Sequence, residues 1–167
     1  MNDWIRCADY VPFWKRQDPE TQDFFERTIA MYWIIHVKTK PPEWMKHNPM
    51  IQDKIGMTTA MYYIIYVEKE PPEWMKHSPT LQNKNGQTLA MLWVRWVKTE
   101  IPKWMKHSPT FGDNSRETLA MYWIMCVETK PPEWMKYSPA LRNIHGYTLE
   151  ILWKEYVDTE PPKLMKL

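Results

Sequence analysis

The chain has 167 residues, 44% of them apolar, which is enough to build the core of one globular or repeat domain. Lysine and arginine outnumber aspartate and glutamate by only two, and both signs are mixed along the chain, which disfavours a nucleic acid or a membrane surface as partner. Two cysteines in unrelated contexts argue against a disulfide framework, and no run reaches the roughly 18 apolar residues of a membrane span. The sequence therefore predicts a cytoplasmic protein.

A 30-residue repeat organises the whole chain. Pro-Pro-Glu-Trp-Met-Lys begins at residues 41, 71 and 131, and Ile-Pro-Lys-Trp-Met-Lys begins at 101. A fixed period of this size indicates units that bury their apolar faces only by stacking on one another. We therefore expect a single solenoid domain over 1–167. Its predicted parts are an N-terminal partial cap at 1–10, five repeats at 11–40, 41–70, 71–100, 101–130 and 131–160, and a C-terminal partial cap at 161–167.

The third repeat shows the elements expected in each unit. Residues 78–86 are rich in turn formers and predict a loop. Thr88 stands where an N-cap is needed, and residues 89–98 contain no glycine or proline and have apolar residues at helical spacing. Pro102 fits the first turn of a second, shorter helix, with Trp104 and Met105 on its buried side. The sequence thus predicts an all-α fold, an α-solenoid of stacked helix-turn-helix units.

Positions that stay the same in every repeat are expected to be structural. The recurring threonine predicts an N-cap for each first helix, and the recurring tryptophan at 14, 44, 74, 104 and 134 is expected in the core beneath the second helix. His47, His77 and His107 also recur, but equivalent atoms in stacked units lie about 10 Å apart, too far to share a metal ion. We expect these histidines to stabilise the C-terminal turn of the second helix.

This order of elements resembles the ankyrin repeat. The family pattern Asp/Asn-x-x-Gly-x-Thr-Pro-Leu-His-x-Ala is matched in part by two stretches, Asp53-Lys54-Ile55-Gly56-Met57-Thr58-Thr59-Ala60-Met61 and Asn83-Lys84-Asn85-Gly86-Gln87-Thr88-Leu89-Ala90-Met91. The resemblance extends over essentially the whole chain, and the unit is most similar to divergent ankyrin-type repeats of protists, viruses and phages. The usual unit has about 33 residues. We expect the shortfall to lie in the second helix, and the proline and histidine of the family motif are absent.

Two repeats depart from the common pattern. In the last repeat Glu150 replaces the recurring alanine and Lys154 replaces an aliphatic residue, one helical turn later. This predicts a solvated ion pair on a face that no further repeat covers. In the fourth repeat Arg116 stands where three other repeats have glycine, so we expect a strained or remodelled loop that is available for contact.

The variable positions are candidates for binding. They include the residue after the loop glycine, at Met57, Gln87, Glu117 and Tyr147. The resemblance implies that loop tips and first helices line a concave surface. The predicted partner-binding residues are Tyr66, Arg95, Trp96 and Tyr156 on the helices and Lys54, Lys84 and Arg116 on the loops, because aromatic and arginine side chains dominate interface energies. Ordinary packing between repeats is the alternative for each of them.

No catalytic motif, metal-ligand spacing or cofactor-binding loop is present in the sequence, so we expect no enzyme, metal or cofactor. The function predicted is a protein-protein interaction module that binds its partner through the concave face and loop tips, with an inhibitor or host-directed effector of viral or phage origin as one form. The alternative is a nucleic-acid-binding repeat protein, which would need more positive charge. Binding of a small molecule comes last.

Overall fold

The computed structural model describes residues 18–135 and 138–165. The predicted N-terminal cap at 1–10 and Trp14 lie outside these residues. Contacts between Cα atoms group the chain into two compact units, unit 1 at 1–78 and unit 2 at 79–167. We describe each unit by itself, and the single domain over 1–167 stays a prediction.

Both units consist of alternating α-helices and single 3₁₀ turns. Unit 1 contains α2 (Ile29–Val37), η3 (Glu43–Met45), α3 (Thr59–Val67) and η4 (Glu73–Met75). Unit 2 contains α4 (Leu89–Trp96), η5 (Lys103–Met105), α5 (Leu119–Val127), η6 (Glu133–Met135), α6 (Leu149–Tyr156) and η7 (Lys163–Met165). Extended pairing within the described ranges amounts to two isolated bridges, Gln52 with Thr58 and Gly112 with Thr118. The predicted all-α class is confirmed.

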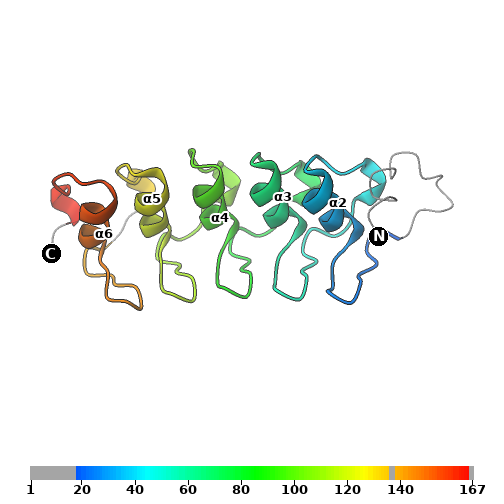
Figure 1. Cartoon of the computed structure of the whole chain (residues 1–167), viewed down its shortest axis with the longest axis horizontal. Coiled ribbons are helices and arrows are strands. Elements are labelled where there is room, and N and C mark those ends of the chain that lie inside the picture. Colours follow the sequence, from blue (N-terminus) through cyan, green and yellow to red (C-terminus); the bar gives the residue numbers. More distant parts are fainter. Residues whose placement is uncertain (1–17, 136–137, 166–167) are drawn as a thin grey trace. The chain divides into compact units, whose positions relative to one another are not determined.

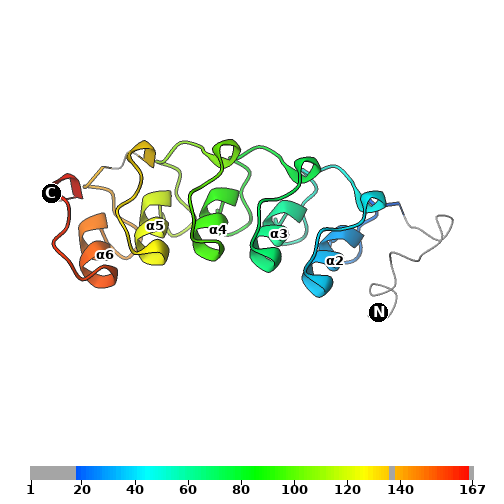
Figure 2. The same ribbon diagram turned by 90° about the horizontal axis from the view of Figure 1, so that it is seen from above.

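Within each unit the α-helices stack side by side and the long loops project to one side (Figure 1). In unit 1, α2 packs against α3, and in unit 2, α5 packs against both α4 and α6. The 3₁₀ turns form a second row beside the α-helices of their own unit (Figure 2). Each unit is thus an α-solenoid stack, as the period predicts.

The recurring threonine caps the N-terminus of each of the five α-helices in the described residues, as predicted. The hydroxyl oxygen of each accepts a hydrogen bond from the backbone N–H three residues later, and the five are Thr28, Thr58, Thr88, Thr118 and Thr148. Each cap contributes about 1 kcal/mol to helix stability. After each helix one non-glycine residue adopts positive φ and turns the chain back; these are Lys38, Glu68, Lys98, Glu128 and Asp158.

The second helix is shorter than predicted. It is a single 3₁₀ turn of three residues, because the preceding proline is extended (Pro42, ψ 151°) and the following residue returns to extended backbone (Lys46, ψ 135°). One turn buries only one side chain, and this is the methionine: Met45, Met75, Met105 and Met135 are fully buried. The adjacent tryptophans are half-buried, and Trp44 and Trp74 pack against the core cluster of unit 1, so their predicted place in the core is confirmed only in part.

The core of unit 2 shows how one repeat covers the next. Ala120, Met121 and Ile124 on α5 pack in one apolar cluster with Leu149, Leu152 and Trp153 of the last repeat and with Met165 of the segment after it. On α6 the positions equivalent to the first three are Glu150, Ile151 and Lys154. Lys154 Nζ donates to Glu150 Oε1 at 2.8 Å. The predicted ion pair on the terminal repeat is confirmed.

Candidate binding surface

The projecting loops, here called fingers 1 to 5, share one internal geometry; their residues are 22–27, 52–57, 82–87, 112–117 and 142–147. In each finger a single carboxylate or amide oxygen accepts two backbone N–H groups, from the residues two and four positions later, at 2.9 to 3.0 Å. The residues concerned are Asp23, Asp53, Asn83, Asp113 and Asn143. A short polar side chain that replaces backbone acceptors in this way fixes the turn.

The choice between aspartate and asparagine follows the residue nine positions later. Each aspartate turns its second oxygen, Oδ2, toward a tyrosine hydroxyl: Tyr32 to Asp23 at 2.6 Å, Tyr62 to Asp53 at 2.5 Å and Tyr122 to Asp113 at 2.9 Å. The two asparagines, Asn83 and Asn143, are matched by Leu92 and Leu152. An amide presents N–H₂ where the carboxylate presents an oxygen, so it offers the tyrosine hydroxyl no second acceptor.

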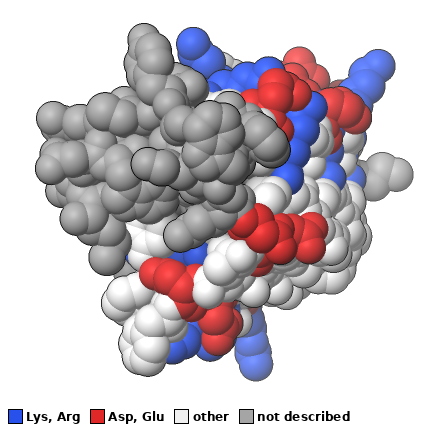
Figure 3. Space-filling view, turned by 90° about the vertical axis from the view of Figure 1, so that its right-hand side faces the viewer, with Lys and Arg blue, Asp and Glu red and all other residues white. Residues whose placement is uncertain are grey.

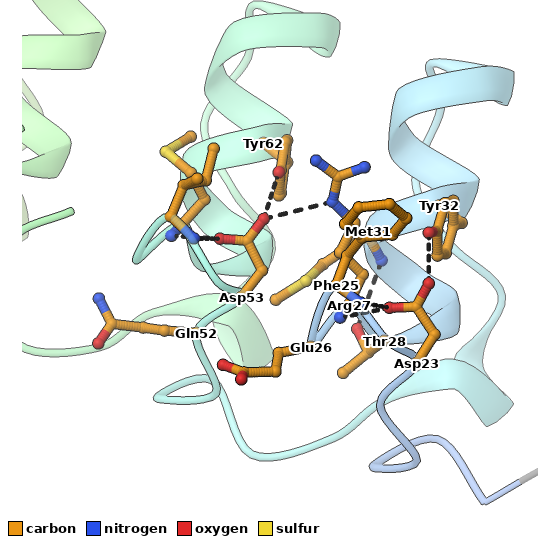
Figure 4. A network of polar contacts seen from close by, with 12 residues as sticks. Asp23, Phe25, Glu26, Arg27, Thr28, Met31, Tyr32, Gln52, Asp53 and Tyr62 are labelled. Atoms are coloured by element: carbon orange, nitrogen blue, oxygen red, sulfur yellow. Dashed lines mark hydrogen bonds and ion pairs between the residues drawn. The ribbon is translucent and has the colours of Figure 1, made fainter. Parts of the chain in front are cut away.

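In unit 1 the fingers are joined through Arg27 (Figure 4). Its Nε lies 3.3 Å from Asp53 Oδ2, and the guanidinium lies 5.6, 5.8 and 5.7 Å from the ring centroids of Phe25, Tyr32 and Tyr62. Burial, with the hydrogen bond to Asp53, raises the pKa of the Tyr62 hydroxyl. The backbone adds a further link, because Lys54 N–H donates to Phe25 O at 3.0 Å.

Unit 2 joins its fingers with different polar groups. Gln87 Nε2 donates to the Tyr122 hydroxyl at 2.9 Å, and Asn143 Nδ2 donates to Glu117 Oε1 at 3.4 Å. Burial and the charge of Asp113 raise the pKa of Glu117. Gln87 is 9% exposed, and in unit 1 Met57, at the same position, is 5% exposed. At 57 and 87 this position is therefore internal packing, and the expectation that it varies for a partner is wrong there.

His77 and His107 lie against the threonines that cap the N-termini of α3 and α4. His77 Nε2 lies 2.9 Å from Thr58 Oγ1, and His107 Nε2 lies 2.8 Å from Thr88 Oγ1. Each Nδ1 faces a backbone carbonyl, which can only accept, so Nδ1 carries the proton and Nε2 accepts from the capping threonine. Desolvation lowers the pKa of both imidazoles.

His47 varies this arrangement in unit 1. Its Nε2 lies 2.8 Å from Thr59 Oγ1 and 3.5 Å from Thr28 Oγ1. The position of Thr59 is aliphatic in the other repeats. The Thr59 hydroxyl thus gives the buried His47 a hydrogen-bond partner that the other repeats lack. The Nδ1 of His47 donates to the carbonyl of Met45, the last residue of η3, at 3.0 Å. The expectation that the recurring histidines stabilise the end of the second helix therefore holds for His47 and is wrong for His77 and His107, whose Nδ1 atoms face Ser78 O and Ser108 O.

The predicted binding residues on the helices are all exposed. In unit 1, Tyr66 on α3 is 37% exposed, and its ring stacks on that of Tyr62 at 6.2 Å. In unit 2, Trp96 on α4 is 43% and Tyr156 on α6 is 42% exposed. Arg95 is exposed beside Trp96 and forms no ion pair within the described part of unit 2.

The predicted charges on the fingers differ in exposure. Lys84 and Arg116 are exposed, whereas Lys54 is half-buried because its Nζ lies 3.6 Å from the centroid of the Phe24 ring. Arg116 has φ 58°, so the expected strain at this position is present.

Apolar residues at the finger tips were not among the predicted site residues. Phe24 is 79%, Phe25 51% and Ile55 54% exposed in unit 1, and Ile144 is 56% exposed in unit 2. Two consecutive phenylalanines in a turn-forming stretch were the available signal, because such a stretch has no core face to bury them. These tips extend the candidate surface of each unit beyond the helices.

The chemistry of the described residues offers no metal centre. No group of three His, Cys, Asp or Glu side chains among them could hold a metal ion. On the face shown in Figure 3, Lys and Arg lie among Asp and Glu. Within the same residues, no helix has the length and apolar character needed to cross a membrane.

Comparison with known proteins identifies the fold. Neither a protein-family model nor a curated protein sequence matches the chain. Among solved structures, it resembles a chain of the complex between the predatory endopeptidase Bd0816 of Bdellovibrio bacteriovorus and the immunity protein Bd3460. The two chains are 14% identical, the match covers 96% of this chain and 94% of that chain, and the TM-score is 0.64. It also resembles EF0377, an ankyrin repeat protein, with 10% identity, 95% and 93% covered, and a TM-score of 0.52. With its stacked 30-residue units, the chain has the ankyrin-repeat fold.

Proposed function

We propose that this chain is a protein-protein interaction module that binds its partner through the outer positions of its α-helices and its finger tips. The observation that carries the proposal is a division within each repeat. The threonine caps and the apolar helix faces recur from repeat to repeat and are buried, and hydrogen bonds fix the finger turns. The outer helix positions and the finger tips instead differ between repeats and expose large side chains.

The outer helix position illustrates the division. Tyr66 in unit 1, and Trp96 and Tyr156 in unit 2, occupy the same place in their repeats, and each is more than a third exposed. Tyrosine and tryptophan supply a large contact area while ordering few rotatable bonds, which is why they anchor interfaces. Arg95, beside Trp96, adds a guanidinium that can bind a carboxylate with two parallel hydrogen bonds.

An inhibitory role is one form of this proposal. A chain of the same fold is found in the complex of an endopeptidase with an immunity protein, so a stack of this kind can take part in a protein complex. The nucleic-acid alternative has less support. Sequence-independent binding to phosphates requires clustered cations, and the cations of both units are interspersed with carboxylates.

Affinity capture with matched variants tests the proposal. The immobilised chain is used to capture partners from a lysate of the source cells, in parallel with Trp96→Ala/Tyr156→Ala and with Glu133→Ala/Lys163→Ala, whose exposed side chains lie in the 3₁₀ turns. We expect a protein that binds the parent and the second variant but not the first. Equal capture by all three chains, or capture of nucleic acid alone, would contradict the proposal.

A further inference from the structure

The outer positions of α4, α5 and α6 follow one another along the side of unit 2, where α5 packs between the other two helices (Figure 2). We call these positions the outer row; it consists of Arg95, Trp96, Met125, Cys126, Glu155 and Tyr156. Arg95 and Trp96 stay exposed although the next repeat packs against α4. The outer row is therefore open in an interior repeat, and it is separate from the faces through which repeats stack.

The charge of the outer row changes sign from α4 to α6. Arg95 is positive, Met125 and Cys126 are uncharged, and Glu155 is negative. Neither charged side chain has an ion-pair partner within the described part of unit 2. A partner that satisfies both charges must carry an acidic group opposite Arg95 and a basic group opposite Glu155.

Arg95 lies near the middle of the outer row as well as at its end. Burial raises the pKa of the Cys126 thiol on α5, and the nearby positive charge of Arg95 opposes this rise. Arg95 opposes in the same way the rise that burial causes in the pKa of Glu117 on finger 4, yet the Glu117 carboxylate accepts its hydrogen bond from Asn143. The donors of Arg95 thus remain available to a partner.

The distance between repeats fits a partner segment in the polyproline II conformation. Equivalent side chains of stacked repeats lie about 10 Å apart. A polyproline II helix has three residues per turn and rises about 3.1 Å per residue, so every third side chain points the same way at intervals of about 9 Å. In a β-strand the third side chain points to the opposite face. A polyproline II segment can therefore place one side chain on each of α4, α5 and α6.

The exposed rings of the outer row favour the same conformation. Trp96 and Tyr156 lie on the first and last helices of the row and are 43% and 42% exposed. Polyproline II segments bind to aromatic side chains at a low entropic cost, because they are ordered before they bind. An amphipathic helix instead binds through a continuous apolar stripe, whereas the outer row carries a charge at either end.

Building on the proposed binding function, we propose that the outer row of unit 2 binds a polyproline II segment of the partner protein. The segment carries an acidic residue opposite Arg95 and, about six positions away, a basic residue opposite Glu155. Its prolines pack on the rings of Trp96 and Tyr156, which provide most of the attraction. The Arg95 guanidinium binds the carboxylate with two parallel hydrogen bonds, and the two charges fix which end of the segment lies on α4.

Selection from random peptides of about 20 residues, displayed on phage, tests the proposal. The immobilised parent chain should enrich peptides that contain proline and that have an acidic and a basic residue about six positions apart. Arg95→Glu should instead enrich peptides with two basic residues at this spacing, and Glu155→Arg peptides with two acidic residues, whichever way the peptide runs. Lys103→Glu, a matched charge change on an exposed residue of η5, is the control and should enrich the same peptides as the parent.

A synthetic peptide from the parent selection then gives affinities by fluorescence anisotropy. Arg95→Glu and Glu155→Arg should each weaken its binding at least tenfold, because each places like charges opposite one another. Lys103→Glu should leave its binding unchanged. A folded circular dichroism spectrum for each variant excludes misfolding as the reason for lost binding.

The outcomes separate this inference from the proposed function. The inference is overturned if the parent chain enriches no peptides, or if the enriched charges do not follow the Arg95 and Glu155 variants. A spacing of about 14 residues would also overturn it, since that spacing indicates an α-helical partner. In each of these cases, a protein captured from the lysate by the parent but not by Trp96→Ala/Tyr156→Ala would leave the proposed binding function standing.

Discussion

The hydroxyl of Tyr122 lies 2.9 Å from Oδ2 of Asp113, and this carboxylate shapes finger 4 with its other oxygen. Tyr122→Leu should destabilise the chain by about 1–3 kcal/mol, because it leaves the carboxylate oxygen and the Gln87 amide without their partner. Adding Asp113→Asn should recover part of this loss, since asparagine and leucine are the pairing at Asn83 and Leu92. Urea unfolding of both single variants and the double variant measures the coupling. Additive losses would show that the pairing has no energetic basis.

Two finger glycines should respond differently to the same substitution. Gly86 and Gly146 both have positive φ, 78° and 83°, so alanine strains the backbone by about 1–2 kcal/mol at either place. At Gly86 the new Cβ would also lie 2.7 Å from the backbone nitrogen of Asn114. We therefore expect Gly86→Ala to cost about 1–3 kcal/mol more than Gly146→Ala in urea unfolding. Similar losses for the two would mean that packing between fingers is loose.

Acid should destabilise the stack through His77 and His107. Burial lowers the pKa of both imidazoles below the ordinary value near 6.5, so below that pH the unfolded chain binds more protons than the folded chain. Their contribution to stability is complete above about pH 6.5 and is lost as the pH falls through the folded-state pKa. Urea unfolding at several pH values between about 7.5 and 5 should show this decline.

The double variant His77→Gln/His107→Gln provides the control for the acid effect, because glutamine offers an acceptor but does not titrate in this range. It should be less stable than the parent near neutral pH and lose less stability toward pH 5. An unchanged dependence on pH would assign the acid sensitivity to other groups.

Two tryptophans on α4 should separate stability from binding. Trp93 is 6% exposed and Trp96 is 43% exposed. Trp93→Ala should destabilise the chain by about 3–5 kcal/mol by opening a cavity, whereas Trp96→Ala should cost far less. If the proposed interface is correct, Trp96→Ala should instead weaken partner binding by about 2 kcal/mol or more, measured by calorimetry. Normal binding by this variant would remove Trp96 from the interface.

A substitution at Arg116 should weaken partner binding without lowering stability. Its φ of 58° favours glycine, which three other repeats have at this position, so Arg116→Gly should leave stability unchanged or raise it by up to about 1 kcal/mol. A modest, salt-dependent loss of partner binding should accompany it, as for a charge at the rim of an interface. Thermal unfolding and binding at two salt concentrations check the two halves. A loss of stability would mean that the arginine side chain supports finger 4.

The fold could be predicted because the same local sequence signals recur in every repeat. Each threonine cap is specified by a local rule, and five copies at one spacing leave little room for another architecture. The 3₁₀ turn could not be predicted in the same way. Pro42 is compatible with either kind of helix, and the extended backbone at Lys46 leads to His47, whose buried hydrogen bond to Thr59 forms only in the folded chain.

The candidate surface was predictable in part. Helical spacing places Tyr66 and Trp96 away from the buried side of their helices, and both are exposed. Contacts from one finger to the next, such as Arg27 with Asp53, depend on distances between repeats that a sequence does not contain. The correlation between aspartate and tyrosine, and between asparagine and leucine, nine residues apart is visible in the five repeats. Only the hydrogen bonds in the structure explain it.

The aspartate–tyrosine and asparagine–leucine pairs also affect how such a gene can evolve. Both members of a pair lie within one 30-residue period, so duplication or deletion of a whole period transmits every pair intact. Crossing over between positions equivalent to 23 and 32 would instead produce a mismatched hybrid whenever it joins an aspartate–tyrosine repeat to an asparagine–leucine repeat, leaving a carboxylate or a hydroxyl unpaired. Selection against such hybrids would favour recombination at other points of the period and allow the array to change length without repairing its fingers.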